Sequence, residues 1–175
     1  MIAPRSDQRV YTITYNLNME GATRGYSNPD TFRVSDLPLT IYPADDSNCG
    51  GAWFIGWDPC DANDTDREQL RAVVLPDMTS NVTFTAQWAY KINLELDGGA
   101  GGLPSSLTGG GYGSRFTLED LPLSMTTPRK DNCRFVRWEP NDGVIPAGTM
   151  SNVTFRAIWE PVEVREEKVG DLTWK

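Results

Sequence analysis

The sequence predicts a mainly β protein, β-grasp-like with little helix, made of two small units in tandem, and three observations support this fold class. Apolar and polar residues alternate along several short runs, which places every second side chain on one face of a strand. Prolines recur between these runs and bar long helices and long central strands. The pattern of the first half also returns in the second half, so the same architecture is predicted to occur twice.

Five blocks of sequence recur in the same order in the two halves of this 175-residue chain. They are TFRVSDLPLT at 31–40 and RFTLEDLPLS at 115–124, NC at 48–49 and 132–133, FIGWDP at 54–59 and FVRWEP at 135–140, LP at 75–76 and IP at 145–146, and SNVTFTAQW at 80–88 and SNVTFRAIW at 151–159. Chance does not place five blocks in register. We therefore predict a first unit at 10–89 and a second at 90–160, joined with almost no linker and flanked by tails at 1–9 and 161–175.

Each unit is expected to open and to close with a strand that buries one face. The apolar positions of the opening strands are Tyr11, Ile13, Tyr15 and Leu17, then Ile92, Leu94 and Leu96, and those of the closing strands are Val82, Phe84, Ala86 and Trp88, then Val153, Phe155, Ala157 and Trp159. Shorter strands are predicted around 32–34 and 53–57, with counterparts at 116–118 and 134–138. A short helix is predicted at 66–74, and the glycine-rich segment 98–113 is expected to be a mobile loop.

Large aromatic side chains are expected to supply most of the core, because units of roughly 70–80 residues bury little apolar surface otherwise. An aromatic side chain buries roughly 150–250 Å². The candidates recur at matched positions and are predicted to pack in the core rather than to form a ligand platform: Trp57, Phe84, Trp88, Trp138, Phe155 and Trp159.

Composition argues against several functions. The chain contains no histidine, which removes His-based nucleophile systems, His-ligated zinc and the commonest general base. Lys and Arg number 16 against 24 Asp and Glu, and the net charge of −8 argues against nucleic acid and anionic lipid as partners. No apolar run approaches the roughly 18 residues that span a bilayer, and 1–9 has no signal-peptide pattern. We therefore predict no catalytic residues, no cofactor and no membrane insertion.

The recurring motifs carry a resemblance to a known family. They are F-x-V/L-x-D-L-P-L at 32–39 and 116–123, F-x-x-W at 54–57 and 135–138, and N-V-T-F-x-A-x-W at 81–88 and 152–159. In this pattern the chain resembles the Listeria–Bacteroides repeat, the B-repeat type of internalin surface proteins. The resemblance implies a compact β-grasp-like module, often in tandem on bacterial surface and secreted proteins. It also implies a spacer, adhesion or binding role with no catalytic residues to carry over.

An acidic insertion at 58–74 distinguishes the first unit from the second. Within it Asp61, Asn63 and Thr65 have the oxygen spacing that begins a calcium loop. However, Asp66 stands where such a loop needs glycine, and Ala72 where it needs glutamate, so a solvated acidic loop is the favoured interpretation. The alternative is a calcium- or carbohydrate-binding module, or a glycan-active enzyme, that uses this insertion.

The cysteines and the tails leave alternatives open. Cys49 and Cys133 occupy the same position in the two units, whereas Cys60 is unmatched, so either all three are free thiols or Cys49 and Cys60 are bridged. In the tail after position 161, Leu172 and Trp174 form a small apolar pair that is predicted either to contact a partner or to fray.

Together these observations predict a non-enzymatic structural or binding module, displayed on a surface as a spacer, decoration or adhesion element. Two settings stay open: a fragment of a bacterial cell-surface or secreted protein, and a phage virion protein such as a capsid decoration or head-fibre component. The expected partner is another protein or a second copy, with a surface glycan as a further possibility. A rigid two-lobed rod without a small-molecule pocket is expected.

Overall fold

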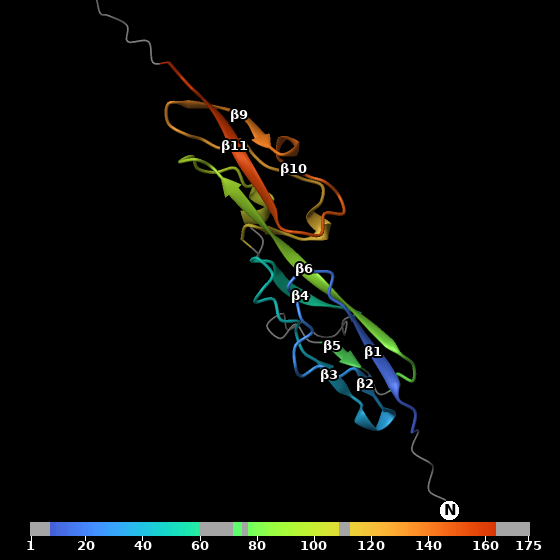
Figure 1. The fold of residues 1–175 in the computed structure, drawn as a ribbon. Helices are drawn as coiled ribbons and strands as arrows, with labels where there is room; N and C mark the ends of the chain where they lie inside the picture. The colour runs from blue at the N-terminus through green and yellow to red at the C-terminus, as the bar shows by residue number, and fades with distance from the viewer. Residues whose placement is uncertain (1–7, 60–71, 75–76, 109–112, 164–175) are drawn as a thin grey trace, which may run out of the picture.

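The computed structural model describes residues 8–59, 72–74, 77–108 and 113–163, and it confirms a mainly β fold. The chain forms an elongated body, and β1 and the end of β11 lie toward its opposite ends (Figure 1). Among the described residues, no helix is long and apolar enough to cross a membrane.

The first unit is built around a three-stranded core of mixed direction. Strand β1 (Tyr11–Asn16) runs parallel to the first half of β6 (Val82–Glu95), and β4 (Trp53–Asp58) runs antiparallel to β6. Strand β2 (Thr31–Phe32) pairs with β1, and the small ladder of β3 (Leu39–Ile41) and β5 (Ala72–Val74) completes the unit.

The second unit has the same pairing pattern. Strand β11 (Val153–Pro161) runs parallel to the second half of β6, and β9 (Cys133–Glu139) runs antiparallel to β11. Strand β7 (Arg115–Phe116) pairs with β6, and β8 (Leu123–Ser124) pairs with β10 (Val144–Ile145). The second half of β6 thus has the place that β1 has in the first unit.

Strand β6 belongs to both units. Its 14 residues, VTFTAQWAYKINLE, contain the predicted closing strand of the first unit and the predicted opening strand of the second. At about 3.3 Å per residue the strand is roughly 45 Å long, and Figure 1 shows it running from one unit into the other. The boundary predicted between Ala89 and Tyr90 therefore falls inside a single continuous strand.

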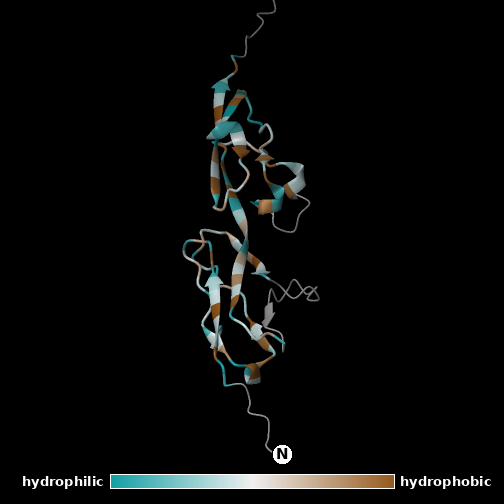
Figure 2. Cartoon of the chain, turned by 90° about the vertical axis from the view of Figure 1, so that its right-hand side faces the viewer, coloured by the Kyte–Doolittle hydropathy of each residue, from teal (hydrophilic) through white to brown (hydrophobic). Residues whose placement is uncertain are grey.

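Alternation along the strands buries one continuous cluster of apolar side chains that runs through both units. Figure 2 shows the alternation as brown and pale or teal bands along the strands. Of the predicted core aromatics, Trp57, Phe84, Trp88, Trp138 and Phe155 are 1–3% exposed, whereas Trp159 is only partly buried. A buried indole N–H needs an acceptor. Each of these tryptophans donates to a main-chain carbonyl: Trp57 to Tyr42, Trp88 to Leu17, Trp138 to Thr126 and Trp159 to Leu96, at 2.6–3.0 Å.

The shared D-L-P motif explains a short 3-10 turn in each unit. The turns are η1 (Val34–Asp36) and η2 (Leu118–Asp120), and a third, η3 (Asn141–Gly143), precedes β10. The Asp36 carboxylate accepts the Arg33 N–H, and the Asp120 carboxylate accepts the Thr117 N–H, both at 2.7 Å. These bonds satisfy an N–H that the start of a helical turn leaves without a partner.

Three predictions of local structure differ from what is observed. Of the helix predicted at 66–74, the part at Ala72–Val74 is strand β5, because its β-branched valines pair with β3, and 66–71 lies outside the described residues. The strands predicted at 32–34 and 116–118 end at Phe32 and Phe116, since the 3-10 turns begin two residues later. Within 98–113, helix α1 (Ser105–Thr108) places Leu107 in the core.

Candidate functional site

The junction between the two units is held by the side chain of Asn152, which lies just before β11. Its amide oxygen accepts the main-chain N–H of Lys91 at 2.7 Å. Its amide nitrogen donates to the carbonyl oxygens of Cys49 at 3.0 Å and Gly50 at 3.3 Å, in the turn that leads to β4 of the first unit. One asparagine therefore connects β6 of the junction to a turn about a hundred residues earlier in the chain.

Arg115 on β7 makes a second connection to the same turn. Its Nε donates to the Gly51 carbonyl at 2.8 Å, and its guanidinium lies 3.5 Å from the centroid of the Trp53 ring. Desolvation lowers the pKa of Arg115, and the nearby Asp46 carboxylate partly opposes this shift. Stacking covers one face of Trp53, which is 43% exposed, so this side chain belongs to the junction rather than to a free aromatic platform.

The turn itself requires glycine. Gly51 has φ +91°, and a Cβ added there would lie 2.8 Å from Cδ of Lys91. Gly50 has φ +61° and approaches the Asn152 amide closely. Since positive φ and close approach both favour glycine, this Gly-Gly pair is the sequence feature that allows the second unit to pack against the first.

A groove of about 780 Å³ crosses the junction and is lined by residues of both units. Its walls include Ile55 of β4 and the exposed Leu118 and Met150 of the second unit. Tyr90 also lines it: the residue is 2% exposed, and burial raises the pKa of its hydroxyl. We expected no pocket from the sequence, and this one was missed because its walls come from segments far apart in the chain.

The far end of the second unit differs in charge from the matching end of the first. The antiparallel bridges Thr23–Asp45 and Ala100–Arg129 are equivalent, so Asp45 and Asp46 in the first unit correspond to Arg129 and Lys130 in the second. Lys130 pairs with Asp97 at 2.9 Å, and Arg134 pairs with Glu160.

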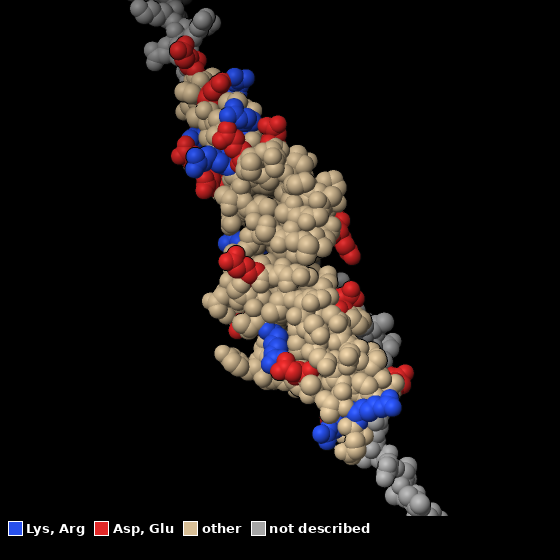
Figure 3. Space-filling view, turned by 45° about the vertical axis from the view of Figure 1, so that its right-hand side comes forward, with Lys and Arg blue, Asp and Glu red and all other residues tan. Residues whose placement is uncertain are grey.

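In Figure 3 charged residues of both signs gather toward the ends of the molecule, and few lie on the middle of this face.

Trp159 is less buried than its counterpart Trp88 because the turn beside it is shorter. Four residues separate Cys49 from Phe54, but only one separates Cys133 from Phe135. The second unit therefore lacks the Gly-Gly turn that the first unit uses at the junction. A shallow pocket of about 530 Å³ remains there, lined by Arg129, Lys130, Arg134 and Trp159 among others.

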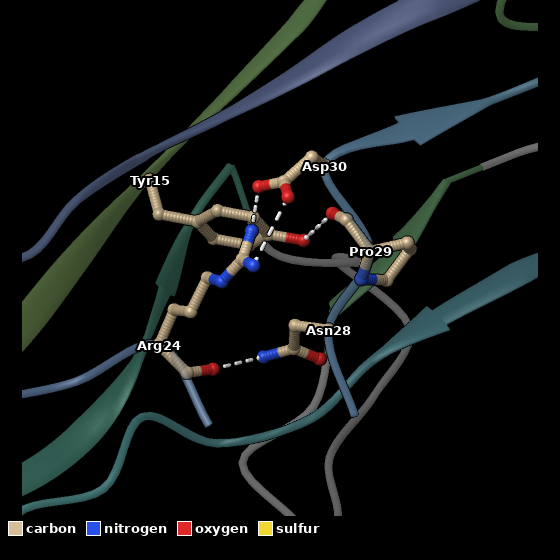
Figure 4. A network of polar contacts seen from close by, with 5 residues as sticks. All are labelled: Tyr15, Arg24, Asn28, Pro29 and Asp30. Carbon is tan, nitrogen blue, oxygen red and sulfur yellow. Dashed lines mark hydrogen bonds and ion pairs between the residues drawn. The ribbon is translucent and has the colours of Figure 1, made fainter. Parts of the chain in front are cut away.

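A polar cluster in the first unit fixes a loop rather than forming an open site (Figure 4). The Tyr15 hydroxyl donates to the Pro29 carbonyl at 2.8 Å, and Arg24 pairs with Asp30. Asn28 is 2% exposed; its amide nitrogen donates to the carbonyls of Arg24 and Tyr42, and its oxygen accepts the Tyr42 N–H at 2.7 Å. Desolvation raises the pKa of Tyr15 to about 12, with Arg24 opposing the shift. All these groups have partners, which indicates a structural role.

The sequence also offered candidate metal ligands, candidate partner contacts and three cysteines. Asp61, Asn63 and Thr65, together with Cys60, Leu172 and Trp174, lie outside the described residues. No group of three or more His, Cys, Asp or Glu that could hold a metal occurs in the described part of the chain. Cys49 is a buried free thiol and Cys133 a partly exposed one. Burial first, then Asp46 and Asp45, raises the pKa of Cys49, so its thiol stays protonated at neutral pH.

Comparison with known proteins identifies no relative. No protein-family model, no curated protein and no solved structure matches this chain.

Proposed function

We propose that this chain is a non-enzymatic spacer or binding module that holds its two ends at a fixed separation on a surface. The observation that carries the proposal is strand β6, whose 14 residues are shared by both units. A continuous strand paired on both halves leaves no flexible linker at the boundary. Such a body transmits position and force between its ends, as a spacer requires.

The junction contacts support the same proposal. Asn152 and Arg115 both bind the Cys49–Gly51 turn, so bending at Ala89 or Tyr90 would break side-chain bonds as well as main-chain pairing. A hydrogen bond contributes about 0.5–1.5 kcal/mol, and leaving a buried partner unpaired costs more. These contacts favour a single relative orientation of the units.

The setting and the partner belong to the proposal as well. The resemblance to tandem modules of bacterial surface proteins favours display at a cell envelope, and an assembled virion is the other setting that suits a short rigid module. We propose a protein partner or a second copy of the chain, and no bound nucleic acid, since the net charge is −8. A surface glycan is the second class of partner.

Small-angle X-ray scattering of a linker-insertion variant tests the spacer role. Four residues, Gly-Ser-Gly-Ser, are inserted between Ala89 and Tyr90, and a matched control carries the same insertion after Gly148, a turn residue with φ +80° and no atom within 4 Å of an added Cβ. We expect the original chain and the control to scatter as the same elongated rigid particle, and the junction variant to scatter as a flexible pair. Equal flexibility in all three chains would argue against a spacer.

A further inference from the structure

The polar cluster around Tyr15 in the first unit (Figure 4) has smaller, uncharged counterparts in the second unit. Tyr15 on β1 lies beside Phe84 of β6, and Leu94 on β6 lies beside Phe155 of β11, in matching parallel ladders. Phe84 and Phe155 are themselves equivalent, because both belong to the repeated closing strand. The second unit therefore has a leucine where the first unit has a tyrosine.

Two further members of the cluster are replaced in the same way. Arg24 corresponds to Gly101, and Asp30 corresponds to Ser114. The equivalence rests on matched main-chain contacts: the Thr23–Asp45 and Ala100–Arg129 bridges, and the 2.8 Å bonds from the Ile13 N–H to the Asp30 carbonyl and from the Ile92 N–H to the Ser114 carbonyl. The second unit thus lacks the tyrosine ring, the guanidinium and the carboxylate together.

In the first unit these side chains fill the space between the opening strand and the loop beside it. The Tyr15 ring packs against Trp57 and Phe84, with ring centroids 5.6 and 6.3 Å apart. The Arg24 guanidinium lies 5.7 Å from the centroid of the Tyr15 ring and pairs with Asp30. The first unit therefore shows that an aromatic ring fits at this position of the fold.

The second unit has a pocket of about 440 Å³ at the same position. The described residues that line it are Ile92, Leu94, Leu96, Gly101, Leu103 and Ser114. Three of these are the counterparts of the first unit's cluster, and none of the six is charged. Replacing large side chains by small ones leaves space where the surroundings cannot collapse, and an apolar cavity of this kind takes up small aromatic molecules.

We propose that this pocket binds a tyrosine side chain of a partner protein, in the place that the Tyr15 ring has in the first unit. The Tyr15 hydroxyl donates to the Pro29 carbonyl at 2.8 Å. Gly113 precedes Ser114 as Pro29 precedes Asp30, so the Gly113 carbonyl is the expected acceptor for the hydroxyl of the bound tyrosine. The inference goes beyond the proposed spacer role, because the pocket is lined by the second unit alone.

The chemistry of the pocket favours tyrosine over other side chains. Its apolar walls suit a neutral ring, and a charged side chain would meet no opposite charge among the described lining residues. Tyrosine combines a large apolar surface with one hydroxyl, and it is enriched among the residues that anchor protein–protein interfaces in pockets. A tyrosine presented by a partner would therefore find both an apolar site and a main-chain acceptor.

Titration of the full-length chain with the peptide acetyl-Gly-Tyr-Gly-amide, followed by amide chemical shifts, tests the proposal. We expect saturable shifts at Gly101, Leu103 and Ser114, with a dissociation constant of about 1 mM for a ligand of this size. Arg24 and Asp30 should not shift, because Tyr15 already occupies the equivalent space. The matching phenylalanine peptide should bind about 2- to 10-fold more weakly, since it lacks the hydroxyl. Absence of saturable shifts, or equal shifts in the two units, would overturn the proposal.

A variant that supplies the ring from within the chain gives a second test. Leu94→Tyr should keep the fold, as Tyr15 does at the equivalent position, and should abolish the shifts caused by the tyrosine peptide. Val136→Tyr is the matched control, because it adds a tyrosine at an exposed position of β9 outside the pocket and should leave binding unchanged. A folded Leu94→Tyr chain that binds the peptide as well as the original chain would contradict the proposed site.

The other aromatic occupant to test is Tyr112 of the same chain, which lies outside the described residues. We expect Tyr112→Ala to bind the tyrosine peptide as the original chain does. Binding that appears only in Tyr112→Ala would mean that the chain fills its own pocket, and would overturn the proposal. The spacer role is tested separately by the linker insertion after Ala89, so a failure of this proposal is distinguished from a failure of that role.

Discussion

At the scale of single residues, Asn152 makes the most side-chain hydrogen bonds at the junction of the two units. Replacing it with alanine removes the acceptor for the Lys91 N–H and the donor to Cys49 and Gly50. We predict that Asn152→Ala lowers the free energy of unfolding by about 1–2 kcal/mol, measured by urea denaturation. Asn81→Ala is the control; it removes only the Thr12 bond and should cost less. Equal losses in the two variants would mean that the contact between the units contributes nothing.

Tyr15 is a residue whose environment predicts a dependence of stability on pH. Its pKa is raised from 10.0 to about 12 by desolvation, so between these values the folded protein keeps a proton that the unfolded chain releases. Unfolding is then favoured as the pH rises, and the contribution of Tyr15 is present in full below pH 10 and is lost toward pH 12. We expect the melting temperature of the original chain to fall more steeply from pH 10 to 12 than that of Tyr15→Phe. Parallel curves for the two proteins would contradict the assignment.

At the scale of elements, the turn at Gly50 and Gly51 determines whether the second unit fits against the first. Gly51→Ala introduces a Cβ at φ +91° and 2.8 Å from the Lys91 side chain. We predict a loss of about 1–3 kcal/mol in the free energy of unfolding. Gly98→Ala is the comparison, because Gly98 has φ +83° but no atom within 4 Å of an added Cβ, so it measures strain without the contact. A loss no larger than that of Gly98→Ala would show that close packing at the turn is unimportant.

The long elements of this fold follow from the sequence, and the short ones do not. Alternation from Val82 onward predicts both halves of β6, although local pattern alone does not show that they form one strand. Two- and three-residue strands such as β5 and β8 carry too few residues for any period, and Ala72–Val74 was wrongly assigned to a helix. The junction was not predicted because Asn152 and Cys49 are separated by 103 positions. One feature of the sequence does indicate the junction. Gly50 and Gly51 follow Cys49 in the first unit, whereas no glycine pair follows Cys133 in the second unit.

At the scale of the whole molecule, we propose that the two units move as one body, because β6, Asn152 and Arg115 connect them. Residual dipolar couplings of backbone amides test this claim most directly, since they report the orientation of each unit in a common frame. We predict that one alignment tensor fits the amides of residues 11–58 and 113–161 together. Two tensors of different magnitude would show that the units reorient independently, and would contradict both the rigid junction and the spacer role built on it.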